Sequence, residues 1–270
     1  MREKSSNSSS RPTPRGPTRV MQILGALSEE PEGMTLARLS AKLREPKTTL
    51  FGTLKGLEAE AYIANIDSVY RLGTAAISLA GKMSGSSRFP GSVRWLLAEL
   101  AARTGETAIL GVPSEDRSEI VYVDMILSRS AIHFAATIGS HRPLFSSAGG
   151  RAILAFQTDA FIDNYLERTP LTAFTDLTDT DPERIRLRLA EVRRDGVIAS
   201  ISETTAGVGG AAAPIFDRQS RVCAAIVVAA PSERVMDRLS ELSARIFEAA
   251  REASLTLGYY GPFPPPRVVA

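Results

Sequence analysis

The chain has 270 residues, enough for two domains of ordinary size, and its 44% hydrophobic and 23% charged residues are typical of a soluble globular protein. It holds no run of about 20 apolar residues, which argues against a transmembrane helix, and its single cysteine, Cys223, excludes an internal disulfide. The net charge is only +2, but residues 1–82 carry 12 Lys and Arg against 8 Asp and Glu, whereas the remainder carries 20 against 22. We therefore expect a cytoplasmic protein whose N-terminal third meets a polyanion.

The first segments of the chain predict a tail and two helices. Residues 1–17 are polar and rich in Ser and Pro, without the apolar segment of a signal peptide, so we predict a disordered tail. Apolar residues at helical spacing predict one helix over about 18–28 and a second over about 35–43, with Thr35 as the cap of the second.

A third helix is predicted to begin near Pro46, after the short link "REPK". Leu50, Leu54 and Leu57 recur along it at i, i+4 and i+7 and form one apolar stripe. The face beside the stripe carries short or cationic side chains with nothing to bury, namely Lys47, Thr48, Thr49, Gly52 and Lys55. Taken alone, this face could equally be an ordinary solvated helix surface.

The neighbouring segments favour DNA binding. Two short helices joined by a tight turn are typical of a helix-turn-helix, whose second helix enters the major groove. Residues 62–66 and 69–72 then predict two strands, joined by the turn residues Asp67 and Ser68, which together would form a wing. We therefore predict a winged helix-turn-helix DNA-binding domain over residues 18–73, with its bare basic face turned towards phosphates and base edges.

The rest of the chain predicts a linker and a second domain of α+β class. Residues 74–90 are rich in small residues and are expected to form a linker helix. Strands are predicted for the runs at 107–112, 119–126, 131–137, 196–201, 209–216 and 222–230. Helices are predicted at about 92–105, 147–157, 159–168, 181–194 and 231–257. This order indicates an antiparallel sheet surrounded by helices over residues 91–260, followed by a C-terminal tail over 261–270.

Five segments carry a resemblance to a known family. They are "TRVMQILGAL", "TLARLSAKLREPKTTLFGTLKGLEAEAYI", "VYRLG", "IGSHRPLFSSAGGRAILAF" and "DGVIASISETTAGVGGAAAPIFDRQSRVCAAIVVAAPSERV". With these segments the chain resembles the IclR family of bacterial transcriptional regulators from about residue 18 to residue 260. The resemblance implies a winged helix-turn-helix joined to a GAF-like effector-binding domain, a homodimer or a dimer of dimers, and a small-molecule effector.

The expected partner of the N-terminal domain is a double-stranded DNA operator. A lone recognition helix makes few base contacts, so we expect two copies on a palindromic site. In the recognition helix the family usually has Arg where this chain has Gly52, and its preceding turn often has Gly where this chain has Arg44. Base specificity therefore does not carry over from relatives. The candidate DNA contacts are Arg19, Lys47, Thr48, Thr49, Thr53, Lys55 and Arg71.

The stretch "LFSSAGGRAILAF" predicts a ligand site from its own residues. Ser147 to Gly150 would form a helix N-terminus, where free N–H groups and the positive end of the helix dipole favour a carboxylate or phosphate. The alternative is that Ser146 merely caps the helix and the glycines pack closely.

The resemblance extends this site to positions in three later segments. The family's ligand positions correspond here to Ser147, Ala148, Gly149, Ser200, Gly210, Val227 and Ala229. Relatives that bind small keto acids commonly have polar groups at the last four positions. Their replacement here favours a larger organic acid with an apolar body, because each buried methylene contributes roughly 0.8 kcal/mol.

Catalysis finds little support in the sequence. His133 and His141 have no carboxylate partner at a recognisable spacing, and neither a metal-ligand cluster nor a G-x-S-x-G motif occurs. Cys223 lies in an apolar run typical of a buried thiol. We predict a regulator that is not an enzyme and needs no metal, cofactor or membrane. The alternatives are a small-molecule sensor that does not bind DNA and a Ser-dependent hydrolase using Ser147.

Overall fold

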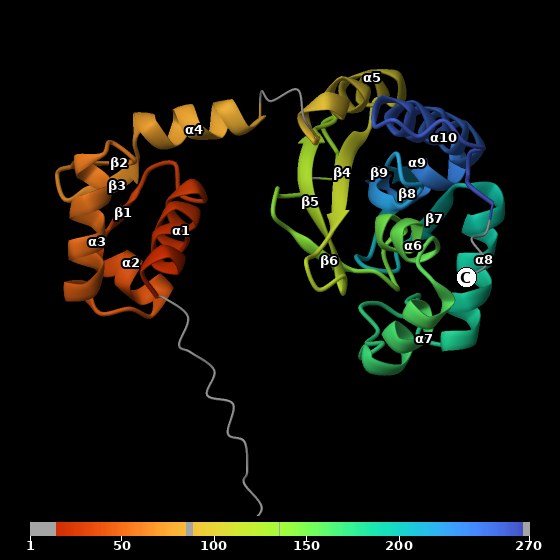
Figure 1. Ribbon diagram of the computed structural model, residues 1–270, viewed down its shortest axis with the longest axis horizontal. Helices are drawn as coiled ribbons and strands as arrows, with labels where there is room; N and C mark the ends of the chain where they lie inside the picture. Colours follow the sequence, from red (N-terminus) through yellow and green to blue (C-terminus); the bar gives the residue numbers. More distant parts are fainter. Residues whose placement is uncertain (1–14, 85–88, 135, 267–270) are drawn as a thin grey trace, which may run out of the picture. The chain divides into compact units, whose positions relative to one another are not determined.

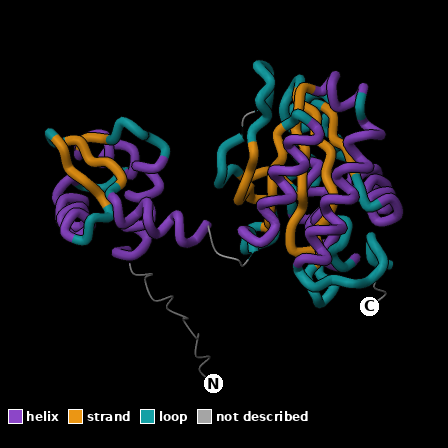
Figure 2. The backbone as a smooth tube through the Cα atoms, turned by 90° about the horizontal axis from the view of Figure 1, so that it is seen from above, coloured by secondary structure: helices purple, strands orange, loops and turns teal. Residues whose placement is uncertain are grey.

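A computed structural model describes residues 15–84, 89–134 and 136–266 of the chain. It divides into two compact units, Met1–Ser86 and Ser87–Ala270, which are described separately (Figures 1 and 2). The predicted disordered tail lies outside the described residues as far as residue 14. Its last three residues are helical, because the first helix begins at Arg15.

The N-terminal unit contains the predicted helices and hairpin. Its helices are α1 (Arg15–Ser28), α2 (Leu36–Leu43), α3 (Lys47–Ala59) and α4 (Thr74–Ser84). Its antiparallel sheet has the order β1 (Met34–Thr35), β3 (Val69–Leu72), β2 (Ile63–Ile66). The strand β1 was not predicted, because two residues give no measurable alternation. The apolar stripe of α3 is buried against α1, α2 and the sheet, as the periodicity predicts.

Local signals explain where these elements begin and turn. Thr35 caps α2, as predicted, by accepting a hydrogen bond of 3.3 Å from the N–H of Arg38. Arg44 ends α2 in the left-handed conformation at φ 52°, which glycine adopts most easily because it has no Cβ. Asp67 and Ser68 both have positive φ, of 51° and 66°, which a two-residue hairpin of type I′ requires.

The C-terminal unit is built on one six-stranded antiparallel sheet in the order β6-β5-β4-β9-β8-β7 (Figure 1). The strands are β4 (Thr107–Pro113), β5 (Glu119–Ile126), β6 (His141–Pro143), β7 (Ile198–Ile201), β8 (Val208–Phe216) and β9 (Val222–Pro231). The helical elements are η1 (Gly91–Val93), α5 (Arg94–Thr104), α6 (Ala148–Leu154), α7 (Asp159–Arg168), α8 (Pro182–Asp195), α9 (Ser232–Asp237) and α10 (Leu239–Thr256).

Helices cover both faces of this sheet. The helices α5, α9 and α10 pack on one face, and α6, α7 and α8 belong to the core on the other (Figures 1 and 2). Along β9, Val227 and Ala229 face α6, whereas Val228 and Ala230 face α10. The strand is therefore buried on both sides, which explains why its sequence is continuously apolar and does not alternate.

The structure corrects the prediction for the edge of the sheet. The strand expected at 131–137 is a loop in its described residues, and β6 forms from "HRP", where no strand was predicted. The backbone of Tyr122 bonds to Gly139 and Ser140, and the neighbouring edge of β5 pairs with β6. The carbonyl of Phe134 instead accepts a hydrogen bond of 2.9 Å from the hydroxyl of Thr107. The edge of β5 is therefore already occupied, and the apolar run at 131–137 does not pair with it.

Two predictions for the C-terminus also differ from the structure. The helix expected over 231–257 is broken at Arg238, whose φ of −115° is not helical and whose guanidinium donates to the carbonyl of Thr104 at 2.9 Å. The segment expected as a tail from residue 261 packs on the unit through Phe263. Its ring lies edge-on to Phe216 and Phe247, with ring centres 5.8 and 5.0 Å apart.

Candidate functional site

The solvent-exposed face of α3 carries three of the candidate DNA contacts. Lys47, Thr48 and Lys55 are exposed along it. Gly52 lies on the same helix, and a Cβ atom added there would meet nothing within 4 Å. The face is therefore convex, basic and sterically open, as a surface entering a DNA groove must be.

The remaining candidate DNA contacts are partly buried or already bonded to other residues of the chain. Thr49 and Thr53 are half-buried, and the hydroxyl of Thr53 lies 3.4 Å from the carbonyl of Thr49. Arg71 is exposed but donates to the carbonyl of Glu32 at 2.9 Å. The side chain of Arg19 is only 15% exposed, and its guanidinium pairs with Glu45 at 3.5 Å. Its geometry fits a link between α1 and the turn before α3 better than a phosphate contact.

One exposed residue of α3 escaped the sequence analysis. Phe51 is 46% exposed, and the ammonium of Lys55 lies 5.3 Å from the centre of its ring. An aromatic residue beside the leucine stripe is the signal that could have identified it. An exposed ring on a recognition helix can contact the methyl group of thymine.

A pocket in the C-terminal unit brings together all seven candidate effector positions. Its empty space amounts to about 420 Å³, part of which is open solvent. It is also lined by Tyr122, Phe134, Arg142, Thr204, Thr205, Val208 and Gly209. Residues from β5, β6, β7, β8, β9 and the start of α6 therefore share one concave site.

The sheet forms the floor of this pocket with a row of small residues. Ser200 on β7 pairs with Gly210 on β8, which in turn pairs with Ala229 on β9. Paired residues of an antiparallel sheet face the same side, so all three residues of this row face α6, as Ala229 does. A Cβ added to Gly210 would lie 3.7 Å from the Cβ of Ala148, an ordinary contact distance. The space therefore exists because the side chains across three strands are short.

The start of α6 differs from the prediction in its hydrogen bonds. Its cap is Ser147 and not Ser146: the hydroxyl of Ser147 accepts from the N–H of Gly150 at 3.1 Å and donates to the carbonyl of Pro143 at 2.9 Å. A Cβ on Gly149 would lie 2.8 Å from Ile120 and Val227. The two glycines thus serve close packing, and the N–H of Gly150 is already bonded.

A buried ion pair fixes the position of α6, whose start lines the pocket across from the sheet. Arg151 is fully buried, and its guanidinium donates to both carboxylate oxygens of Glu203, at 2.9 and 2.5 Å. The Nε–H of the same guanidinium donates to the carbonyl of Phe145 at 2.6 Å. This pair joins α6 to the loop after β7.

The pocket contains one charged side chain that the sequence analysis missed. Arg142 lies on β6, and its guanidinium carbon is 5.9 Å from the centre of the Tyr122 ring. Burial raises the pKa of Tyr122, an effect that the positive charge of Arg142 opposes. Nothing in the sequence indicated that Arg142 lines a pocket, because the three residues of β6 are too few to show the alternation of a strand.

The side chains considered for catalysis bond to other residues and not to one another. Both hydrogen bonds of the Ser147 hydroxyl are those of a helix cap, and neither histidine takes part in them. His133 is exposed in a loop, with Nδ1 2.8 Å from the carbonyl of Ser130. His141 has a carboxylate partner after all, Glu119 at 2.8 Å, across the β5–β6 pair at the surface.

The described residues contain no group of three or more His, Cys, Asp or Glu that could hold a metal ion. Within the same ranges, none of the helices combines the length and the apolar character needed to cross a membrane.

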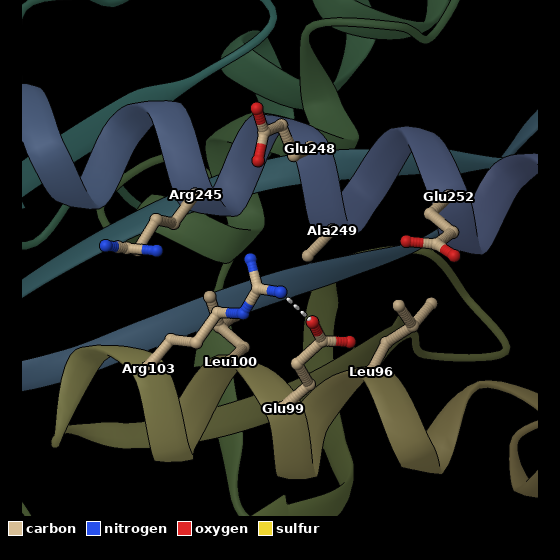
Figure 3. A pocket seen from close by; sticks show the side chains of 8 residues that line it. All are labelled: Leu96, Glu99, Leu100, Arg103, Arg245, Glu248, Ala249 and Glu252. Carbon is tan, nitrogen blue, oxygen red and sulfur yellow. Dashed lines mark ion pairs between the residues drawn. The ribbon is translucent and has the colours of Figure 1, made fainter.

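A second concave region lies between α5 and α10 (Figure 3). Its charged side chains have both signs, and Arg103 pairs with Glu99 on its own helix at 2.5 Å. None of the candidate site residues lines it. The groove has the composition of a solvated surface between two packed helices.

Comparisons with known proteins match this two-part organisation. The family model described as "Bacterial transcriptional regulator IclR C-terminal" matches residues 91–255, and that of the "IclR helix-turn-helix domain" matches residues 17–65. The chain is 30% identical over 244 residues to the HTH-type transcriptional regulator XynR of Escherichia coli, covering 89% of this chain and 96% of that protein. It is 31% identical over 240 residues to the HTH-type transcriptional regulator BhcR of Paracoccus denitrificans, covering 87% and 85%. The crystal structure of an IclR transcriptional regulator from Alicyclobacillus acidocaldarius has a TM-score of 0.79 at 24% identity, over 91% of this chain and 100% of that one.

Proposed function

Because the chain belongs to the IclR family of bacterial transcriptional regulators, we propose that an organic acid with an apolar body controls its binding to a palindromic operator. The observation that carries the proposal is that one pocket is lined by all seven candidate effector positions. The chain acts in this account as a cytoplasmic regulator and not as an enzyme. Its partners are double-stranded DNA, a small molecule and a second copy of itself, as a dimer or a dimer of dimers.

The operator is expected to be palindromic because each copy of the chain offers one recognition helix. The exposed face of α3 spans Lys47 to Lys55, which supplies too few base contacts for specificity by itself. Two copies would occupy half-sites about 34 Å apart, one turn of the double helix. Footprinting of the full chain on its operator should show two symmetric protected half-sites. A monomer bound to one unrepeated half-site would contradict the proposal.

The composition of the pocket supports an effector with an apolar body. Val227 and Ala229 line it, at positions where the family resemblance implies polar side chains in relatives that bind small keto acids. The hydroxyl of Ser200 already donates to the carbonyl of Ser146 at 3.1 Å, which leaves it fewer bonds for a ligand. A tiny polar acid would therefore lack partners, whereas each methylene buried on the small-residue floor contributes roughly 0.8 kcal/mol.

A thermal-shift screen of the full chain against aromatic and aliphatic carboxylic acids tests this proposal. A ligand that binds only the folded state raises the melting temperature by mass action. Ala229→Trp should abolish the shift by filling the floor of the pocket. Gly210→Ala should weaken it less, because the added methyl group meets Val228, Ala148 and Val227 only at 3.6 to 3.9 Å. An unchanged shift in a folded Ala229→Trp variant would place the effector elsewhere.

A further inference from the structure

The pocket lining points to one residue that decides how the acid is held, an inference that rests on the proposed function. We propose that Arg142 binds the carboxylate of the effector through its guanidinium. The expected ligand is a monocarboxylate whose apolar body extends from Arg142 over the floor of small residues.

Charge singles out this residue first. Among the described residues that line the pocket, Arg142 is the only one with a charged side chain. A positive charge at the wall of a half-enclosed site, facing apolar and hydroxyl groups, selects for a negatively charged ligand. A guanidinium also matches a carboxylate geometrically, because two parallel N–H groups can bond to its two oxygens.

The bonding of Arg142 leaves that charge uncompensated. Its guanidinium donates to the carbonyl of His141 at 2.7 Å, a neutral acceptor. Within the described part of the chain no carboxylate lies within 4.0 Å of it. Arg151 and Arg234, by contrast, are bound in bidentate pairs to Glu203 and Glu106.

The surrounding strands hold Arg142 in place for this role. It pairs with Ile120 across the β5–β6 edge, where β6 is the last strand of the sheet. The ring of Tyr122, which is only 7% exposed, lies beside the guanidinium on the pocket wall. A cation supported by an aromatic ring keeps its position without the cost of ordering a free side chain.

The start of α6 offers a second anchor, but two of its N–H groups are already bonded within the helix. The N–H of Gly150 is bound to Ser147, and that of Arg151 is bound to the carbonyl of Ser147 at 2.9 Å. The helix is also only one to two turns long, so its dipole is weak. Arg142 therefore supplies the formal charge, and Ser147 and Ala148 border the ligand.

The experiment compares acids with their neutral amides on the full chain. Binding of benzoate, benzamide, hexanoate and hexanamide is measured by titration calorimetry for the wild type, Arg142→Gln and Arg142→Lys. Arg142→Gln should weaken the acids about 10- to 100-fold, the typical loss of a charge-assisted hydrogen bond, and leave the amides unchanged. Arg142→Lys keeps the positive charge but lacks the two parallel N–H groups. Its affinity for the acids should therefore lie between those of the wild type and Arg142→Gln. Arg168→Gln, at an exposed position of α7 outside the pocket, removes a charge as the matched control.

Each outcome separates this inference from the proposed function. If Ala229→Trp abolishes acid binding but Arg142→Gln and Arg142→Lys bind acids as the wild type does, the pocket is right and its anchor is wrong. If amides lose as much affinity as acids, Arg142 shapes the pocket and does not bind the carboxylate. If none of the acids binds the wild type, the proposal that the effector is an acid is wrong, and so is the proposed role of Arg142.

Discussion

The two units of this chain place their polar groups in opposite ways. In the N-terminal unit the cations of α3 are exposed beside glycines with open space around them. In the C-terminal unit Arg151 and Glu203 are buried as a pair, and hydroxyls and glycines line a concave pocket. A polyanion is met by an exposed surface with free charges, whereas a small molecule is held in a mostly apolar concave site by a few polar groups that remain free to bond to it. The same residue types therefore have different energetic roles in the two units.

The largest expected effect comes from breaking the buried ion pair. Glu203→Ala should destabilise the C-terminal unit by about 3–5 kcal/mol, because it leaves the charge of Arg151 buried without a partner. Glu32→Ala breaks the exposed pair with Arg71 in the other unit and should cost less than about 1 kcal/mol. Amide hydrogen exchange of the full chain measures both, in β9 and α3 respectively. Equal losses would refute the contrast between the units.

The single cysteine gives a second measure of burial in the C-terminal unit. Desolvation raises the pKa of Cys223 from 9.0 to about 12, so the thiolate at pH 8 is about a thousandfold rarer than in the unfolded chain. Alkylation of the native protein should be slower by about that factor, and raising the pH towards 12 should restore the rate. The rate of iodoacetamide labelling, with and without denaturant, checks this. Native labelling as fast as that of the unfolded chain would show that β9 is not protected.

A smaller effect is expected on DNA binding from a single exposed cation. Lys47→Ala should weaken binding to all sequences alike and reduce the salt slope of the affinity by about one, because one phosphate contact is lost. Phe51→Ala should instead change the preference at one base pair. Fluorescence anisotropy at several salt concentrations, with operator variants, distinguishes the two. A change of base preference in Lys47→Ala would reverse the assignment of these roles.

The smallest effect is expected from replacing either of two glycines, which lie in different surroundings, by alanine. Gly52→Ala should stabilise the N-terminal unit by about 0.5–1 kcal/mol, because Ala favours the helix and its methyl group meets nothing. Gly149→Ala should have the opposite sign, because its methyl group would lie 2.8 Å from Ile120 and Val227. Denaturant unfolding of each variant gives the two signs. Stabilisation by both changes would show that α6 is not closely packed.

Periodicity predicted most of the fold because helices and buried strands leave repeating apolar patterns. The stripe of α3 and the hairpin after it were predicted in this way, and the continuous apolar run at 222–230 indicated a strand, which the structure places in β9. The strand β6 was not, because three residues at a sheet edge owe their conformation to β5 and not to their own sequence. The break at Arg238 depends on a bond to Thr104, which is distant in sequence.

The candidate sites were predictable to a different degree. The register of Ser200, Gly210 and Ala229 brings together positions that the family resemblance indicated one by one. Arg142 could not be found in the same way, because only the pairing of β6 places it at the pocket. The hydrogen bond from Gly150 to Ser147 could not be predicted either, because the sequence does not show whether a serine hydroxyl caps a helix or is free to bind a ligand.

The most direct test of the account is the coupling between the pocket and the operator. Fluorescence anisotropy of a labelled operator measures its affinity for the full chain with and without the acid that binds best in the thermal-shift screen. Because linked sites share one coupling free energy, the acid should change operator affinity about 5- to 150-fold in the wild type. It should have no effect on Ala229→Trp, whose affinity without acid serves as the control. An acid that binds the wild type but leaves operator affinity unchanged, or that acts equally on Ala229→Trp, would contradict the account.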